Sequence, residues 1–201
     1  LITDVISDVA SEDPALVASG PSIAAPFAPE AALEILKTSG IAVSQALAAA
    51  IRANCPPPFT PHPVHILARN EDALIAVCNR AESDGWKLVD LGKALTGNAS
   101  DMGCIHAEIA ARYTQRTGRF LLVSGGELTV QGARKGGRGG PNLEYLAGLM
   151  TRLNSYAPIH ALAGDSDGID GTENNAGGYF DVAWANPDGA RAALAENRTY
   201  D

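Results

Sequence analysis

The sequence predicts an α/β protein with a three-layer α/β/α architecture, in which helices cover both faces of a mostly parallel or mixed sheet. The main observation is that apolar, β-branched segments alternate along the chain with Ala-rich segments of helical character. The composition agrees, because 46% hydrophobic and 19% charged residues are typical of a globular protein. A chain of 201 residues is also long enough to bury a hydrophobic core.

The first part of the chain predicts one strand and two helices. Residues 1–9 are apolar and β-branched, which indicates a strand, whereas Pro and Gly prevent long regular structure in residues 11–29. Helices are expected over 29–40, closed by a terminal glycine, and over 42–54. The Pro-dense residues 55–63 are the best candidate for a linker, so we expect domains at 1–54 and 64–201.

The second part continues the alternation of strands and helices. Strands are expected over residues 64–68, 86–92, 119–130 and from 159 onward, and helices over 70–85, 100–118, 141–156 and 187–201. Asn70 and Ser100 are candidate N-caps, Pro141 suits a first helical turn, and a Gly pair interrupts the strand at 125–126.

Charge and cysteine content limit the classes of partner. A net charge of −8 argues against nucleic acid or an anionic membrane as the main partner. Three cysteines (Cys55, Cys78 and Cys104) fit reduced thiols in the cytoplasm, and no apolar run approaches the length of about 20 residues that a membrane helix needs. The chain begins at Leu1, without Met, directly in a predicted strand, so we expect it to be part of a longer protein.

Three Gly-containing loops follow predicted strands, at 7–22, 124–140 and 164–178. Ligands of open α/β sheets bind beyond the carboxyl ends of strands, and Gly lets backbone N–H groups approach a phosphate closely. The loop 132–142 adds positive charge through Arg134, Lys135 and Arg138. It predicts an anion site, with a solvated hairpin tip as an equal alternative. Neither a Walker A loop nor a dinucleotide fingerprint is present, so nicotinamide binding is unsupported.

Carboxylates gather near the same loops: Asp4, Asp8, Glu12, Asp13, Glu127, Asp165, Asp167 and Asp170. Phosphoryl transfer needs carboxylates that hold Mg²⁺ and orient the attacking hydroxyl, although a single Asp is more often a turn former or a cap. Calcium is disfavoured, since the closing Glu of an EF-hand is missing.

The histidines give little support for a metal site. Cys104, His106 and Glu108 lie in a helical pattern, where residues two apart face different directions. His62 and His65 have no nearby ligand partner in the sequence, and His160 is expected to be a core residue of a buried strand.

Four motifs, in order, resemble the type 2 glycerate kinases. SDVASEDPALVASGPS is similar to the family's Ser-Asp-Val segment, and SGGELTV, GRGGPNLEYLA and GDSDGIDGTENNAGG are similar to its later motifs, the last of which usually reads Gly-Thr-Asp-Gly-Ile-Asp-Gly-Pro-Thr-Asp-Ala-Ala-Gly. The resemblance covers essentially the whole chain, including the family's MOFRL domain. Members have also been labelled hydroxypyruvate reductases.

The resemblance implies ATP-dependent phosphorylation of D-glycerate to 2-phosphoglycerate with Mg²⁺, in a cleft between two α/β domains. It makes residues 1–54 the end of the nucleotide-binding domain and 64–201 a MOFRL-type domain that is incomplete at its C-terminus. It assigns Asp8 to metal or substrate-hydroxyl handling and places Asp13 at the metal. The other motif positions, which would bind substrate or phosphate, are Ser19, Gly20, Ser22, Glu127, Arg138, Asn142, Glu144, Asp167 and Asp170. A homodimer is one expected assembly.

Several motif positions depart from the family. Ser11 replaces Gly, Glu12 replaces Asp, Pro141 replaces Arg, Leu143 replaces Gln and Asn174 replaces Asp. Loss of an Arg weakens phosphate recognition, because Pro offers no donors. Two alternatives therefore stand beside the kinase: a non-catalytic MOFRL-type module that binds a ligand or partner, and a hydroxypyruvate reductase, which the missing dinucleotide fingerprint disfavours.

Overall fold

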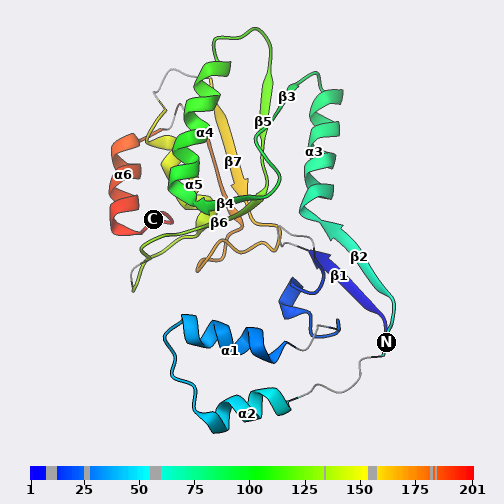
Figure 1. The fold of residues 1–201 in the computed structure, drawn as a ribbon. Coiled ribbons are helices and arrows are strands. Elements are labelled where there is room, and N and C mark those ends of the chain that lie inside the picture. The colour runs from blue at the N-terminus through cyan, green and yellow to red at the C-terminus, as the bar shows by residue number, and fades with distance from the viewer. Residues whose placement is uncertain are drawn as a thin grey trace. The chain divides into compact units, whose positions relative to one another are not determined.

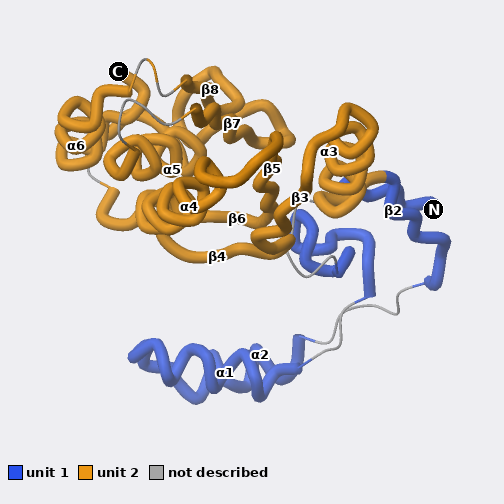
Figure 2. Tube along the Cα trace, turned by 90° about the horizontal axis from the view of Figure 1, so that it is seen from above, with its two compact units in different colours: residues 1–7, 12–67 blue, residues 8–11, 68–201 orange. Residues whose placement is uncertain are grey.

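The α/β class is confirmed by a computed structural model, which describes residues 1–7, 13–24, 28–54, 60–133, 135–153, 158–181, 183 and 185–201. The chain divides into two compact units (Figure 2). Unit 1 comprises Leu1–Ser7 and Glu12–Leu67, and unit 2 comprises Asp8–Ser11 and Ala68–Asp201. None of the helices within the described ranges combines the length and the apolar character that a membrane span needs.

Unit 1 contains a two-stranded sheet, a short 3-10 turn and a pair of helices. Strand β1 (Thr3–Ser7) pairs with β2 (Val64–Arg69), η1 covers Val17–Ser19, and α1 (Pro29–Thr38) lies against α2 (Gln45–Ala53). The Ser44 hydroxyl caps α2 by accepting from the Leu47 N–H at 3.2 Å.

Few side chains of unit 1 are buried. Among its described residues only Val5 and Ser7 are, and neither helix buries a residue. Apolar side chains face solvent instead, with Ile6 71% and Leu67 63% exposed. The hydrophobic effect therefore contributes little to holding this unit together internally.

Unit 2 carries two parallel ladders joined by a bend. Strand β3 (Lys87–Asp90) pairs with β5 (Phe120–Val123), and β4 (Leu95–Asn98) pairs with β6 (Gly126–Thr129). The bend lies at the predicted Gly pair, where the Gly125 N–H donates to the Gly92 carbonyl at 2.9 Å. The predicted interruption of the strand is thus confirmed, whereas β4 was not expected from the sequence.

The helices and strands that remain to be named in the described part of unit 2 are an antiparallel pair of strands and four helices. Strand β7 (His160–Gly164) pairs with β8 (Gly177–Asp181), and β8 was also not expected. The helices are α3 (Asn70–Ser83), α4 (Ala99–Tyr113), α5 (Pro141–Met150) and α6 (Pro187–Glu196). The described strands of the whole chain form four two-stranded sheets.

The core of unit 2 forms where α5 packs between α4 and the β7–β8 pair (Figure 1). Its buried members are Ala107, Leu146, Leu149, Leu153 and Phe180. The crossing of α4 and α5 depends on two glycines, because a Cβ on Gly103 would lie 2.1 Å from the Tyr145 carbonyl oxygen and one on Gly148 would lie 2.2 Å from that of Ser100. The two helix backbones are therefore in direct contact.

Two predicted N-caps are wrong by one or two residues. Asn98, not Ser100, caps α4, with its side-chain oxygen accepting from the Asp101 N–H at 2.9 Å, and Ser100 donates to the same oxygen at 2.7 Å. Asn70 lies inside α3, whose N-cap is Arg69. The predicted helix over 100–118 also ends early, at Tyr113.

We expect Gly148→Ala to destabilise the protein by about 1–3 kcal/mol, because the new methyl group overlaps the Ser100 carbonyl. Denaturant unfolding measures the loss. Gly164→Ala is the matched control, since its Cβ would make an ordinary 3.5 Å contact with the Ala176 carbonyl oxygen. Equal effects of the two substitutions would contradict direct contact of the helix backbones.

Candidate functional site at the glycine-rich loops

The Asp170 carboxylate holds the start of α5. It is fully buried, and one oxygen accepts from the Asn142 backbone N–H at 2.9 Å and from the Asn142 side-chain amide at 3.2 Å. The other oxygen accepts from the Leu143 N–H at 3.0 Å. The residue at the N-cap position, Gly140, has no side chain to do this. The first turn of α5 is therefore already bound to an internal anion.

The loop 164–178, which contains Asp170, is in close backbone contact with the loop 124–140 that precedes α5. A Cβ on Gly140 would lie 2.4 Å from Asp170 Oδ1, and a Cβ on Gly171 would lie 2.5 Å from the Gly139 carbonyl oxygen. Gly171 also has a φ of +66°, which L side chains rarely adopt. The Gly content of both loops thus serves their mutual packing.

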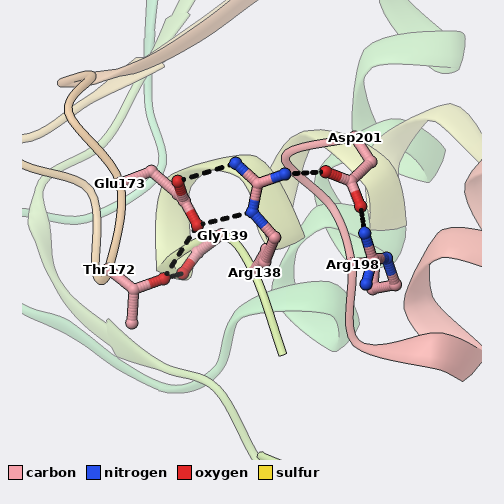
Figure 3. A network of polar contacts seen from close by, with 6 residues as sticks. All are labelled: Arg138, Gly139, Thr172, Glu173, Arg198 and Asp201. Atoms are coloured by element: carbon pink, nitrogen blue, oxygen red, sulfur yellow. Dashed lines mark hydrogen bonds and ion pairs between the residues drawn. The ribbon is translucent and has the colours of Figure 1, made fainter. Parts of the chain in front are cut away.

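The Arg138 guanidinium is surrounded by the chain's own carboxylates (Figure 3). Its Nε and Nη2 each donate to Glu173 at 3.1 Å, and its Nη1 donates to Asp201 at 2.5 Å. Asp201 also pairs with Arg198, and the Tyr200 ring lies 4.7 Å from the Arg138 guanidinium carbon. Arg138, which the resemblance predicts to bind phosphate, is therefore engaged in an ion cluster with these carboxylates.

The local electrostatics differ between the ion cluster and the start of α5. The hydrogen bonds from Arg138 lower the pKa of Glu173 and, in return, raise the pKa of Arg138. Burial raises the pKa of Glu144, which is 6% exposed in the first turn of α5. The pKa of Asp165 is raised by burial and next by the nearby charge of Asp167.

The remaining predicted residues of unit 2 do not join this cluster through any contact among the described residues. Asp167 is exposed and its Oδ1 accepts from the Ile169 N–H at 2.8 Å, which is a turn-forming role. Glu127 is exposed on β6, opposite Thr96. Lys135 is exposed, and Arg134 lies outside the described residues.

In unit 1, the segment around Ser19 has an unusual backbone. Ala18, Ser19 and Gly20 all have left-handed φ values of 48°, 63° and 53°. Such a run costs conformational energy and is found where surrounding structure fixes it. Ser22 accepts from the Thr3 hydroxyl at 2.9 Å, which ties the same segment to β1.

Of the two predicted metal ligands, Asp13 and Asp8, only Asp13 lies among the described residues. Asp13 is exposed and its Oδ1 accepts from the Ala15 N–H at 2.9 Å. Asp8 lies outside the described residues. Within the described part of the chain, no group of three or more His, Cys, Asp or Glu side chains is placed to hold a metal ion. The described residues alone therefore do not complete a magnesium site, because one of the two predicted ligands lies outside them, and we assign no step through Mg²⁺ or ATP.

The histidines differ partly from expectation. His160 is exposed, not a core residue, and its Nδ1 lies 3.0 Å from the Tyr179 hydroxyl and 3.3 Å from Asp181 Oδ2. His62 and His65 do have partners, Thr3 at 2.7 Å and Asp4 at 3.1 Å. His106 is buried beside the Tyr145 hydroxyl at 3.0 Å, and burial lowers the pKa of His106.

Family comparison identifies the part of the chain that carries the glycine-rich loops. Residues 120–201 match the model of the MOFRL family, and residues 1–54 match a domain of unknown function (DUF4147). The C-terminal part of this chain is thus similar to the MOFRL family, and the matched residues 120–201 are called the MOFRL domain. The MOFRL domain thus contains the Asp170 cap and the whole ion cluster of Arg138.

Relatives confirm the resemblance to the glycerate kinases. A "Putative hydroxypyruvate reductase" from Agrobacterium vitis is 37% identical over 88% of this chain and 42% of its own length. A glycerate 2-kinase from Pyrococcus horikoshii is 30% identical over 88% of this chain and 43% of its own. The crystal structure of a Thermotoga maritima glycerate kinase shares the fold, with a TM-score of 0.80, 24% identity, and coverage of 99% of this chain and 50% of that one. The chain spans half or less of the length of these three proteins.

Sequence reasoning missed Glu173 and Asp201, which neutralise Arg138. No spacing rule joins positions 138, 173 and 201, because their contact depends on the packing of three separate loops.

We expect Asp170→Ala to lower the free energy of unfolding by about 1–3 kcal/mol, because it leaves buried N–H groups of α5 without an acceptor. Denaturant unfolding measures this loss. Asp167→Ala is the control in the same loop, and its exposed turn makes an effect within about 0.5 kcal/mol the expected result. A loss as large as that of Asp170→Ala would refute the special role of the buried carboxylate.

Glu173→Gln and Glu144→Gln should change the pH dependence of the unfolding free energy in opposite directions. The pKa of Glu173 is lower in the folded state than its unfolded value of 4.5. Its carboxylate therefore contributes fully to the unfolding free energy above pH 4.5, and this contribution is lost as the pH falls through the folded-state pKa. The folded-state pKa of Glu144 is raised, so its carboxyl favours folding most below 4.5 and loses that contribution as pH rises through the folded value. The measurement is the unfolding free energy of wild type, Glu173→Gln and Glu144→Gln from pH 3.5 to 7.

Proposed function

We propose that the protein to which this chain belongs transfers a phosphoryl group from ATP to D-glycerate and forms 2-phosphoglycerate. The observation that carries the proposal is the set of four glycerate kinase motifs in order, on a backbone that matches a glycerate kinase with a TM-score of 0.80. Glycerate 2-kinase is also the name of a relative that is 30% identical over 88% of this chain.

In this proposal the two predicted domains, 1–54 and 64–201, contribute different parts of the machinery. Residues 1–54 contribute the end of the nucleotide-binding domain, where Asp8 handles the metal or the substrate hydroxyl and Asp13 contributes to the metal site. Ser19, Gly20 and Ser22 form the adjoining loop, and its fixed left-handed backbone supports a positioning role. The MOFRL domain contributes the loops before and after α5. ATP and Mg²⁺ belong to the proposal for the whole protein.

A non-catalytic MOFRL-type module is the second candidate, and one observation favours it. Two positive charges expected to bind phosphate at the glycine-rich loop 132–142 are not available for it. Arg138 is neutralised by Glu173 and Asp201, and Pro141 stands where the resemblance predicts Arg. A protein with this loop would keep the fold and lose affinity for phosphate.

The proposal also places the protein in the cytoplasm, with a small-molecule substrate and a homodimer as its assembly. The acidic composition supports only the small-molecule substrate in preference to nucleic acid or an anionic membrane, because a net charge of −8 opposes binding to both.

The deciding experiment is a coupled assay of the intact gene product with ATP, Mg²⁺ and D-glycerate. We expect turnover that falls by about 100-fold or more in Asp8→Ala, as is common when a catalytic side chain is removed. The control variant is Asp188→Ala, which removes an exposed carboxylate of α6.

Two results would overturn the kinase proposal. Oxidation of NADH with hydroxypyruvate, in the absence of kinase turnover, would support the reductase. Absence of both activities in a folded, full-length protein would support the non-catalytic module.

A further inference from the structure

Asn70 begins α3 but does not cap it. The cap residue is Arg69, whose backbone N–H donates to the Asp72 carboxylate at 2.9 Å. The side-chain amide of Asn70 instead donates from Nδ2 to the Lys93 carbonyl at 3.2 Å, in the segment between β3 and β4. Asn70 therefore joins the start of α3 to a segment 23 residues further along the chain.

The same side chain covers the bend between β5 and β6. A Cβ on Gly125 would lie 2.5 Å from Asn70 Nδ2 and 2.8 Å from Leu74 Cδ1, so both side chains lie directly on the Gly125 backbone. Helix α3 also packs along β3 and β5 (Figure 1). Asn70 thus contacts the chain just beyond the carboxyl ends of two neighbouring parallel strands.

Backbone contacts connect the segment after β3 with the bend after β5. The Gly125 carbonyl accepts from the Leu95 N–H at 2.9 Å, in addition to the bond from the Gly125 N–H to Gly92. A Cβ on Gly126 would lie 2.2 Å from the Leu95 backbone nitrogen, so the bend packs against the start of β4 with no side chain between them. The segment 92–95, to which Asn70 is hydrogen-bonded, therefore fixes where β6 begins.

Glu127 follows this bend directly. It is the second residue of β6, lies opposite Thr96 of β4 and is exposed. The resemblance to the glycerate kinases predicts that Glu127 binds substrate or phosphate, and ligands of open α/β sheets bind outside the carboxyl ends of the strands. Because only Gly126 separates Glu127 from Gly125, a displacement of the bend would also displace Glu127.

We propose that Asn70 is a positioning residue of the substrate site, which holds the bend at Gly125 and Gly126 so that Glu127 reaches its ligand. The amide combines two properties that this position requires, because it lies flat on Gly125 and donates a hydrogen bond to Lys93. Glu127 contacts the ligand, and Asn70 acts through it. The inference rests on the proposed function, since Glu127 needs a substrate to bind.

The first test is the kcat/KM of the intact protein for D-glycerate. We expect Asn70→Ala to lower it by about tenfold or more, because a small displacement of a binding group costs much of the rate. Asn70→Asp keeps the shape of the side chain but has no N–H for the Lys93 carbonyl, so we expect a similar loss. Asn79→Ala is the matched control, because it truncates the same kind of side chain at an exposed position of α3.

A double-mutant cycle with Glu127→Gln distinguishes positioning from a general loss of folded protein. If Asn70 acts through Glu127, Asn70→Ala should lower kcat/KM by less than about twofold in the Glu127→Gln background. Independent losses that multiply would overturn the proposal. Wild-type turnover in Asn70→Asp, or a loss in Asn79→Ala equal to that in Asn70→Ala, would overturn it as well.

Amide hydrogen exchange tests the inference without an assay of turnover. The N–H groups of Gly125 and Leu95 are bonded within the bend, and we expect both to exchange faster in Asn70→Ala than in Asn79→Ala, as measured by NMR. Exchange that is equal in the two variants would refute the role of Asn70. Absence of kinase turnover in the wild-type protein would count against the proposed function instead, so the two failures are distinguishable.

Discussion

The buried Asp170 carboxylate is the interaction on which the loops of the MOFRL domain depend. It completes the hydrogen bonding of the first turn of α5 and lies against Gly140, so it fixes where that helix begins. Helix α5 in turn contributes Leu146 and Leu149 to the core. A helix N-terminus in a Gly-rich setting is usually read as a place for a bound phosphate, but here an internal anion occupies it.

This arrangement explains why one protein contains both the acidic loop 164–178 and the basic loop 132–142. Both loops contain residues that an external ligand could use, and both use them on each other, through Asp170 at the helix and through Arg138 with Glu173. Charge that looks like a binding signature in the sequence is here a packing interaction between segments about 30 residues apart. The kinase chemistry that the relatives suggest therefore requires either displacement of these contacts or residues outside them.

Much of the fold could be predicted because its signals are local. Helices α1 and α3 were expected from their helical patterning, and the bend between β5 and β6 from its Gly pair. Strands β4 and β8 were missed, because β4 contains Gly and Asn and β8 opens with two Gly, and only pairing with distant β6 and β7 makes them strands. In the candidate site, a capping role was expected for an Asp of this loop, and Asp170 has that role. That it caps α5, and that Arg138 pairs with Glu173 and Asp201, could not be predicted, because these partners are far away in the sequence.

The sparse burial in unit 1 has a consequence for how the protein opens. Helices α1 and α2 bury no residue, whereas the α4–α5 crossing is closed by direct backbone contact. Within this stretch of the protein, amide hydrogens of α1 and α2 should therefore exchange with solvent through local opening more readily than those at the α4–α5 crossing. Local opening and global unfolding are therefore expected to differ between these two parts of the chain.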